Sequence, residues 1–502
     1  AVQAAWAGSP DAVASAVEAA RAAAEALGES AAPRLWAPPL PVRAAAGVAT
    51  SERTHPPGIP LLLTDRPDAR RHGIWSWPAG LPLLIAGGPA TGRTTALATI
   101  ATGALRRGWP VHVVHGRGRA GDLVDLRSHG AFGTHVGAND PRRLVRLLEL
   151  LGDGAGGADS DPAEKALLCV DDVEEVIDAC DAMPGPSGAD RLNRLLRECR
   201  SLSLAVAVAG PPEIFAARWA RGVRQRVILG ELDPSQAALL GVPRPALLTG
   251  PPPGRGLLTD HGPPVVTQVL LPEPAAVVSA EPNCALRLRE LPHTLTREDV
   301  LRAAYPPPGT KRRGDEVPDA RVALAIGGDD AGACWLDVRP GARILVTGPP
   351  GSGRTTALDW IANQLPVSGR RVRRLGDMCR LGDNGTVQVD VADALQHEDA
   401  LLVDDADRLD PEAGGHLSRL WRARSGVVVA ATRSDAGFAA AVTVLRDAGQ
   451  TVVLAPTRGG PGHLRAADVM PHADPAQPRL PGRGVLVDAR GGVPIQLPAP
   501  PG

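Results

Sequence analysis

Short apolar runs alternate with amphipathic segments along the chain. In the first half the apolar runs lie at residues 59–63, 83–86, 111–114, 166–172, 204–209 and 226–229, and helical patterns lie between several of them, including one through Leu105 and one at 140–151. Runs of this length, alternating with helices, are typical of a parallel sheet that is covered by helices on both faces. A separate helix is predicted to begin at Ser9 and Pro10 and to end at Gly28.

The same pattern then starts again. Leu40 and Pro41 match Leu291 and Pro292, and each half closes with a Pro-Gly-Arg-Gly turn. A glutamine follows the arginine of that turn by the same interval in both halves, from 255 to 268 and from 483 to 496. Self-similarity of this kind indicates a repeated unit. We therefore predict two tandem α/β modules, at residues 1–272 and 283–502, joined by a linker at 273–282, with a mobile loop at 306–316.

Each predicted module contains a glycine-rich loop between an apolar strand and a helix. Both loops follow the phosphate-binding pattern G-x-x-x-x-G-K-[ST] except that arginine stands in place of lysine. Backbone N–H groups and a helix N-terminus converge on phosphate oxygens in such a loop, and glycines let them approach. The candidate nucleotide-binding residues are Gly87, Gly92, Arg93, Thr94 and Thr95 in the first loop, and Gly348, Gly353, Arg354, Thr355 and Thr356 in the second.

The arginines Arg93 and Arg354 have two interpretations. Arginine keeps the positive charge but is planar and bulkier than lysine, so nucleotide binding is expected to survive better than fast hydrolysis. The chain has only two lysines, Lys165 and Lys311, so a general bias toward arginine also accounts for the replacement. A glycine-rich turn that binds no ligand is the structural alternative for each loop.

Paired carboxylates follow one apolar strand in each half. Asp171 and Asp404 are placed to reach Mg²⁺ together with the hydroxyls of Thr94 and Thr355. The next residues, Asp172 and Asp405, are the candidate catalytic bases. Their alternative role is to cap the ends of the strands.

Further candidates lie near the ends of the next apolar strands. Thr432 is a candidate γ-phosphate sensor in the second half, whereas Gly210 at the matching place has no side chain. Four arginines are candidates for action across a subunit boundary, although solvated surface positions are the competing interpretation: Arg218, Arg221, Arg224 and Arg433.

Composition restricts the class of protein. The formal net charge is -1, so no global excess of positive charge indicates nucleic acid. The six cysteines are scattered without metal-ligand spacing, which fits a reducing cytoplasm. No apolar run is long enough to span a membrane. Because the chain begins with Ala1 rather than methionine, we expect it to be the cytosolic part of a longer, membrane-anchored protein.

These motifs together resemble the FtsK/SpoIIIE superfamily, and most closely the C-terminal degenerate ATPase modules of EccC-type proteins of type VII secretion. The resembling segments occur in the family's order over nearly the whole chain: RLWAPPLP at 34–41, LTDRP at 63–67, AALLGVP at 237–243 and PPGRG at 252–256. The resemblance implies two RecA-like folds, ATP with Mg²⁺, ring-forming oligomers, a preceding ATPase module or membrane component, and protein cargo.

The expected function is therefore an ATP-binding tandem module that regulates a translocase or hydrolyses ATP weakly. Two alternatives remain. An active DNA-translocating ATPase predicts DNA-stimulated hydrolysis, and a nucleotide-free scaffold predicts peptide binding without ATP. The second loop is expected to bind ATP better than the first, because its Pro-Pro-Gly-Ser segment is closer to an ordinary phosphate cradle.

Overall fold

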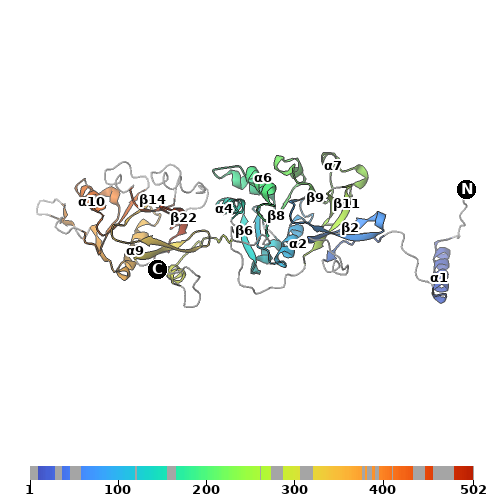
Figure 1. The fold of residues 1–502 in the computed structure, drawn as a ribbon, viewed down its shortest axis with the longest axis horizontal. Helices are drawn as coiled ribbons and strands as arrows, with labels where there is room; N and C mark the ends of the chain where they lie inside the picture. The colour runs from blue at the N-terminus through green and yellow to red at the C-terminus, as the bar shows by residue number, and fades with distance from the viewer. Residues whose placement is uncertain are drawn as a thin grey trace.

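The computed structural model describes residues 9–28, 37–45, 58–118, 121–154, 165–260, 262–272, 286–305, 320–375, 379–381, 387–389, 395–409, 411–433, 447–455 and 480–500. These residues form two large sheets that lie in separate lobes of an elongated molecule (Figure 1). We call the lobe with strands β1 to β11 the first module and the lobe with strands β12 to β22 the second module. The predicted linker at 273–282 and loop at 306–316 lie outside the described residues, so the domain boundaries remain a prediction.

The sheet of the first module has eleven strands. Along its main path it contains β3 (Arg71–Trp77), β2 (Ile59–Arg66), β11 (Val265–Leu271), β10 (Arg255–Thr259), β9 (Gln225–Leu229), β4 (Leu83–Gly87), β8 (Leu204–Gly210), β7 (Ala166–Val170), β5 (Val111–His115) and β6 (Phe132–Gly137), while β1 (Ala44–Ala45) pairs with β11. The strands from β9 to β6 are parallel, whereas β10, β11, β2 and β3 are added in antiparallel register. The predicted parallel sheet is confirmed for the core, and the antiparallel edge is an addition.

Helices cover both faces of this sheet. One face packs on α2 (Arg93–Leu105) and the short α3 (Asp122–Asp125), and the other packs on α4 (Pro141–Gly152), α5 (Val173–Asp181) and α6 (Gly188–Glu198). Successive residues of β4 alternate between the two cores: Leu83 and Ile85 face α2, while Leu84 faces the opposite core. A strand buried on both faces is apolar throughout, which explains the unbroken apolar runs of the sequence.

The second module repeats this strand order with nine strands. Its sheet runs β13 (Gly332–Asp337), β12 (Arg321–Gly327), β22 (Gly491–Gln496), β21 (Arg483–Asp488), β20 (Gln450–Leu454), β14 (Arg343–Gly348), β19 (Val427–Arg433), β18 (Asp399–Val403) and β15 (Arg371–Arg374). Helix α9 (Arg354–Gln364) packs on one face, and Leu417 and Trp421 of α10 (Pro411–Ala423) pack on the other. A described hairpin, β16 (Cys379–Leu381) and β17 (Val387–Val389), stands apart from this sheet, and α8 (Arg297–Ala304) packs beside β12.

The matching arginine and glutamine make the same contacts to backbone carbonyls in both modules. Arg255 donates to the carbonyls of Leu40 and Pro41, and Arg483 donates to those of Leu291 and Pro292. The amide of Gln268 donates to Pro253 O at 3.0 Å, and that of Gln496 donates to Pro481 O at 2.9 Å. Each arginine therefore ties the closing hairpin of its module to the segment that enters the module.

Two further features complete the fold. Helix α1 (Pro10–Ala26) begins as predicted, with Ser9 accepting from Ala12 N, but none of its residues is buried and Figure 1 shows it apart from the sheets. Helix α7 (Pro234–Leu240) begins with a capping box between Asp233 and Gln236. The described helices include none with both the length and the apolar character of a membrane span.

Candidate functional site

Both glycine-rich loops lie at the carboxyl end of a central parallel strand. The first connects β4 to α2 and the second connects β14 to α9. Each of these strands has parallel neighbours on both sides, β8 and β9 in one module and β19 and β20 in the other. In open α/β sheets, ligands bind in the crevice at the carboxyl ends of such strands.

The last glycine of each loop has a backbone conformation that favours glycine. Gly92 has φ 102° and Gly353 has φ 96°, and each is the residue that precedes the first turn of the helix. A Cβ on Gly92 would also lie 3.1 Å from Gly254 N, because Gly254 N donates to Thr91 O at 2.8 Å. Gly482 N donates to Ser352 O in the second module. In each module, a backbone hydrogen bond therefore joins the closing turn to the glycine-rich loop.

The threonine after each loop contacts the first carboxylate of the paired aspartates. Thr94 Oγ1 donates to Asp171 Oδ2 at 2.6 Å, and Thr355 Oγ1 donates to Asp404 Oδ2 at 2.8 Å. The sequence predicts these four side chains as Mg²⁺ ligands, and the structure brings them together in two matching pairs. A hydroxyl beside a carboxylate is the oxygen donor set that Mg²⁺ prefers.

The arginine of each loop contacts the second carboxylate. Arg93 Nη2 lies 2.9 Å from Asp172 Oδ1, and Arg354 Nη2 lies 3.3 Å from Asp405 Oδ1. The arginine side chains are 17% and 12% exposed, and the aspartates are 41% and 37% exposed. The sequence singled out these residues separately, as a lysine replacement and a candidate base. It did not predict that they pair.

The backbone of the second aspartate is unusual in both modules. Asp172 has φ 48° and Asp405 has φ 43°, in the left-handed region. The amide of each donates to the carboxylate of the preceding aspartate, at 3.1 Å in the first module and 2.9 Å in the second. Non-glycine residues adopt this conformation at a cost and are enriched at functional sites. In this conformation the second carboxylate contacts the arginine of the loop.

The two sites differ in how deeply the first carboxylate is buried. Asp171 is 3% exposed, whereas Asp404 is exposed. Burial raises the pKa of Asp171, and the hydrogen bond from Thr94 acts in the opposite direction. The first site therefore holds its carboxylate in a less polar environment than the second.

The residues fit a bound Mg²⁺–nucleotide. Among the described residues, Ser352 Oγ and Arg354 Nη1 of the second loop are buried and have no hydrogen-bond partner, so two donors near the cradle are unsatisfied. The loop backbones, the two arginines and the first helical turns would hold the phosphates, and Thr94 with Asp171 or Thr355 with Asp404 would hold the ion. Whether the second loop binds ATP more tightly remains a prediction.

The other residues that the sequence predicts as site residues lie farther from the glycine-rich loops or beside them. Thr95 and Thr356 lie one residue farther into α2 and α9. Thr432 pairs with Thr347 across β14 and β19, so it stands beside the second loop. The arginines Arg218, Arg221 and Arg224 are exposed, as expected for surface residues. Their proposed action across a subunit boundary remains untested.

Two residues near the sites were missed by the sequence analysis. Asp407 accepts from Thr432 Oγ1 at 3.2 Å and from Arg433 N at 3.1 Å, and it therefore holds the end of β19 beside the second loop. His115 ends β5 next to Asp171, where burial lowers the pKa of its imidazole and Asp171 acts in the opposite direction. Only one feature of the sequence could have indicated Asp407: it lies two residues after the paired aspartates.

Comparisons with solved structures identify the same arrangement of modules. ATPase domains 2 and 3 of EssC from Geobacillus thermodenitrificans match with a TM-score of 0.60 and 14% identity, over 92% of this chain and 100% of that chain. ATPases 2 and 3 of Thermomonospora curvata EccC, in complex with a signal sequence peptide, match with a TM-score of 0.54 and 18% identity, over 93% and 100%. The cytoplasmic domain of the Thermomonospora curvata type VII secretion ATPase EccC gives 0.53 and 17% identity, over 94% of this chain and 65% of that domain.

No protein-family model matches this sequence, and neither does any curated protein. At these identities the likeness concerns the fold. The α/β fold class and the suspected resemblance are both confirmed. This chain has the fold of the tandem ATPase domains 2 and 3 of the type VII secretion proteins EssC and EccC.

Proposed function

We propose that both modules bind ATP with Mg²⁺ and hydrolyse it slowly or not at all, and that the chain is a regulatory part of a membrane-associated secretion translocase. The observation that carries the proposal is the matching pair of contacts in each module, Thr94 with Asp171 and Arg93 with Asp172, repeated by Thr355 with Asp404 and Arg354 with Asp405. If the glycine-rich turns bound no ligand, the repetition of these polar contacts in both modules would have no explanation.

Each side chain has a definite task in this proposal. Loop N–H groups and the N-terminal turns of α2 and α9 bind the phosphates, since both carry partial positive charge. Thr94 and Asp171 orient Mg²⁺ in the first site, as Thr355 and Asp404 do in the second. Mg²⁺ supplies charge neutralisation on the phosphates when it is bound. Arg93 and Arg354 exchange a carboxylate partner for a phosphate partner.

Slow hydrolysis follows from the same contacts. Asp172 and Asp405 are the candidate bases, and each carboxylate is held by the arginine of its own loop. A carboxylate oxygen that accepts a hydrogen bond from a guanidinium is already engaged, so it is less available to contact an attacking water. We therefore infer that these modules contribute ATP binding rather than ATP hydrolysis.

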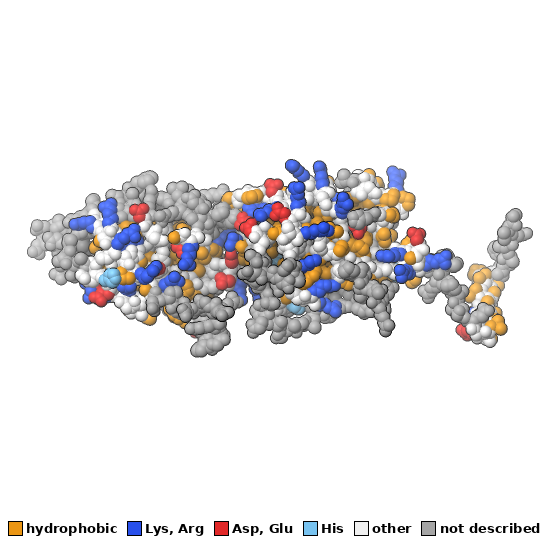
Figure 2. Space-filling view, in the orientation of Figure 1, with side chains coloured by type: hydrophobic (Ala, Val, Ile, Leu, Met, Phe, Trp, Pro, Cys, Tyr) orange, Lys and Arg blue, Asp and Glu red, His pale blue; other side chains and the backbone are white. Residues whose placement is uncertain are grey.

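The secretion context rests on the similar structures. One of them is an EccC fragment in complex with a signal sequence peptide. We infer that this chain likewise serves a secretion system and contacts a segment of a protein cargo. Double-stranded DNA is a less suitable substrate: the formal net charge is -1, and Figure 2 shows arginines interspersed with acidic side chains on the visible face.

The proposal is tested with a fluorescent ATP analogue and the purified chain. We expect saturable binding that requires Mg²⁺, with a turnover that does not respond to duplex DNA. If binding were not saturable, the proposal that the modules bind ATP would be contradicted, and the nucleotide-free, peptide-binding scaffold would be favoured. Stimulation of hydrolysis by DNA, together with salt-sensitive DNA binding, would instead favour a DNA-translocating ATPase.

A further inference from the structure

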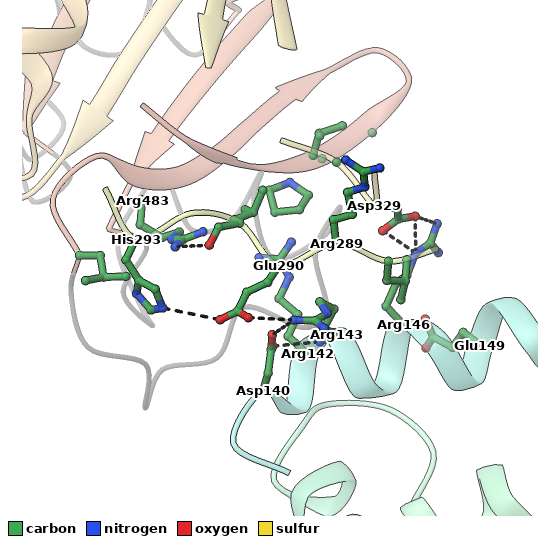
Figure 3. A pocket seen from close by; sticks show the side chains of 18 of the residues that line it. Asp140, Arg142, Arg143, Arg146, Glu149, Arg289, Glu290, His293, Asp329 and Arg483 are labelled. Carbon is green, nitrogen blue, oxygen red and sulfur yellow. Dashed lines mark hydrogen bonds and ion pairs between the residues drawn. The ribbon is translucent and has the colours of Figure 1, made fainter. Parts of the chain in front are cut away.

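A polar cleft of about 650 Å³ lies where the two modules meet (Figure 3). One wall is the first part of α4 in the first module. The opposite wall comes from the second module and consists of the β12–β13 turn, Arg483 and the β21–β22 turn, with residues 288–293 along the side. The volume is within the range of about 300–1,000 Å³ that is typical of small-molecule sites. The cleft is separate from both glycine-rich loops.

Six arginines and four carboxylates line the cleft. The arginines are Arg142, Arg143, Arg146, Arg289, Arg483 and Arg490. Three of the carboxylates are already engaged: Asp140 and Glu290 lie 3.3 Å and 3.8 Å from Arg143, and Asp329 lies 2.9 Å from Arg146. The fourth, Glu149, accepts from Arg191 at 2.8 Å. The acidic side chains therefore leave the cleft with an excess of positive charge.

Two of these arginines are available to a ligand. Arg289 and Arg490 are exposed, and within the described residues their guanidinium groups make no hydrogen bond or ion pair. They lie on different elements. The backbone N–H of Arg289 donates to Asp329 O, which places Arg289 beside the β12–β13 turn, and Arg490 lies in the β21–β22 turn. Two guanidinium groups on separate elements of one cleft suit a ligand that carries more than one anionic group.

Deeper in the cleft, positive charges crowd together. The pKa of Arg142 is lowered to about 10, mainly by burial; Arg483 and Arg146 contribute to the lowering, while Asp140 and Asp329 act in the opposite direction. In the part of the chain that the structure describes, no group accepts a hydrogen bond from the buried Nε of Arg143 or from that of Arg483. An anion in the cleft would relieve this repulsion, since arginine prefers planar, bidentate contact with phosphate or carboxylate.

We propose that this cleft binds a small molecule that carries clustered phosphate groups, and that the bound molecule bridges the two modules. The guanidinium groups bind its phosphates, and its organic part packs on the apolar wall of Leu288, Leu480 and Val493. Because the walls belong to different modules, the ligand stabilises one relative orientation of the two. The inference goes beyond ATP binding at the loops and does not depend on it.

The test uses isothermal titration of the full chain with inorganic pyrophosphate. The double variant Arg289→Ala/Arg490→Ala removes the two available guanidinium groups, and Arg93→Ala/Arg354→Ala alters the loops. Arg197→Ala removes one exposed charge from α6, outside the cleft, as the matched control. We expect the cleft variant to lose one class of sites or to bind it at least about tenfold more weakly. The loop variant and the Arg197 control should keep that site within about twofold.

Hydrogen exchange supplies a second measurement. Pyrophosphate should slow exchange at residues 141–146 and 490–494 in the wild type and in the loop variant, and not in Arg289→Ala/Arg490→Ala. Equal binding by the cleft variant and the wild type would overturn the proposal, as would an equal response to citrate, which carries carboxylates in place of phosphates. If the chain failed to bind the ATP analogue but still bound pyrophosphate in the cleft, the proposed function would be contradicted and the cleft proposal would stand.

Discussion

Arg93 and Asp172 form an ion pair at 2.9 Å between the first turn of α2 and the end of β7, and Arg354 and Asp405 form the same pair at 3.3 Å in the second module. The pair joins the residue that replaces the usual lysine to the residue that is the candidate base. In the proposed ATP-bound state, nucleotide and aspartate compete for the same guanidinium group. This competition makes several properties of the two sites measurable.

Replacement of Asp172 by asparagine should tighten ATP binding at the first site and lower turnover. Arg93 would lose its carboxylate partner and become available to phosphate. Because the pair is partly exposed and such pairs contribute less than about 1 kcal/mol, the gain in affinity should not exceed about fivefold. Titration with a fluorescent ATP analogue measures it.

Asp178→Asn is the matched control, since Asp178 is an exposed carboxylate on the same helix α5. It should leave the affinity unchanged. Asp405→Asn should have a smaller effect than Asp172→Asn, because its ion pair is longer. Weaker ATP binding by Asp172→Asn would contradict the competition.

Replacement of Arg93 or Arg354 by lysine should raise the rate of ATP hydrolysis by about tenfold, equivalent to about 1.4 kcal/mol of barrier. Lysine presents a compact charge to the phosphates and cannot hold the aspartate in the same planar contact. Steady-state phosphate release measures the change. Arg197→Lys is a surface control on α6, and an unchanged rate in both loop variants would favour a scaffold without turnover.

Removal of the Thr94 hydroxyl should affect both stability and Mg²⁺ dependence. Thr94→Ala deletes the 2.6 Å hydrogen bond to the buried Asp171 and should lower the free energy of unfolding by about 1 kcal/mol. The tightening of ATP binding by Mg²⁺ should also be lost at that site. Thr94→Ser keeps the hydroxyl and should restore both properties in urea denaturation and nucleotide titration. Failure of serine to restore the Mg²⁺ effect would argue against the threonine as a ligand.

The pH dependence of the first module should carry the signature of Asp171. Its pKa is raised by burial above the ordinary value of 3.8, so the folded state binds this proton more tightly than the unfolded state. The stability that this group contributes is present below the unfolded pKa and is lost as the pH rises through the folded pKa. Asp171→Asn should therefore raise the melting temperature at neutral pH while it abolishes the Mg²⁺ effect on ATP binding. A melting temperature lowered at neutral pH would contradict the burial argument.

Arg343 should be a stability determinant of the second module rather than a site residue. It is 3% exposed, and its guanidinium donates to the carbonyls of Leu420, Trp421 and Gly426 near the end of α10. Arg343→Met leaves these carbonyls without their donor and should cost about 3 kcal/mol in urea denaturation. Arg339→Met is the control: its side chain is 73% exposed and should change the free energy of unfolding by less than about 0.5 kcal/mol.

The sequence by itself determined several strands of the parallel core, the loops and the paired carboxylates, whereas β6, β15 and β20 were not predicted. These features are local: apolar runs mark buried strands, glycine at Gly92 and Gly353 allows a positive φ, and acidic residues follow the strand ends. The repeat was also readable, because Arg255 with Gln268 and Arg483 with Gln496 keep the same interval. The antiparallel edge of each sheet was not predicted, since short apolar strands carry little information about the direction of their partner.

Only the tertiary structure decided which of these residues meet. Arg93 and Asp172 are 79 positions apart in the sequence, and their contact depends on β4, β8 and β7 lying side by side. The cleft between the modules depends on still more distant neighbours: Arg146 and Asp329 are 183 positions apart. Contacts of this range are set by strand order and by the packing of one module on the other. Neither leaves a periodic signal in the residues themselves.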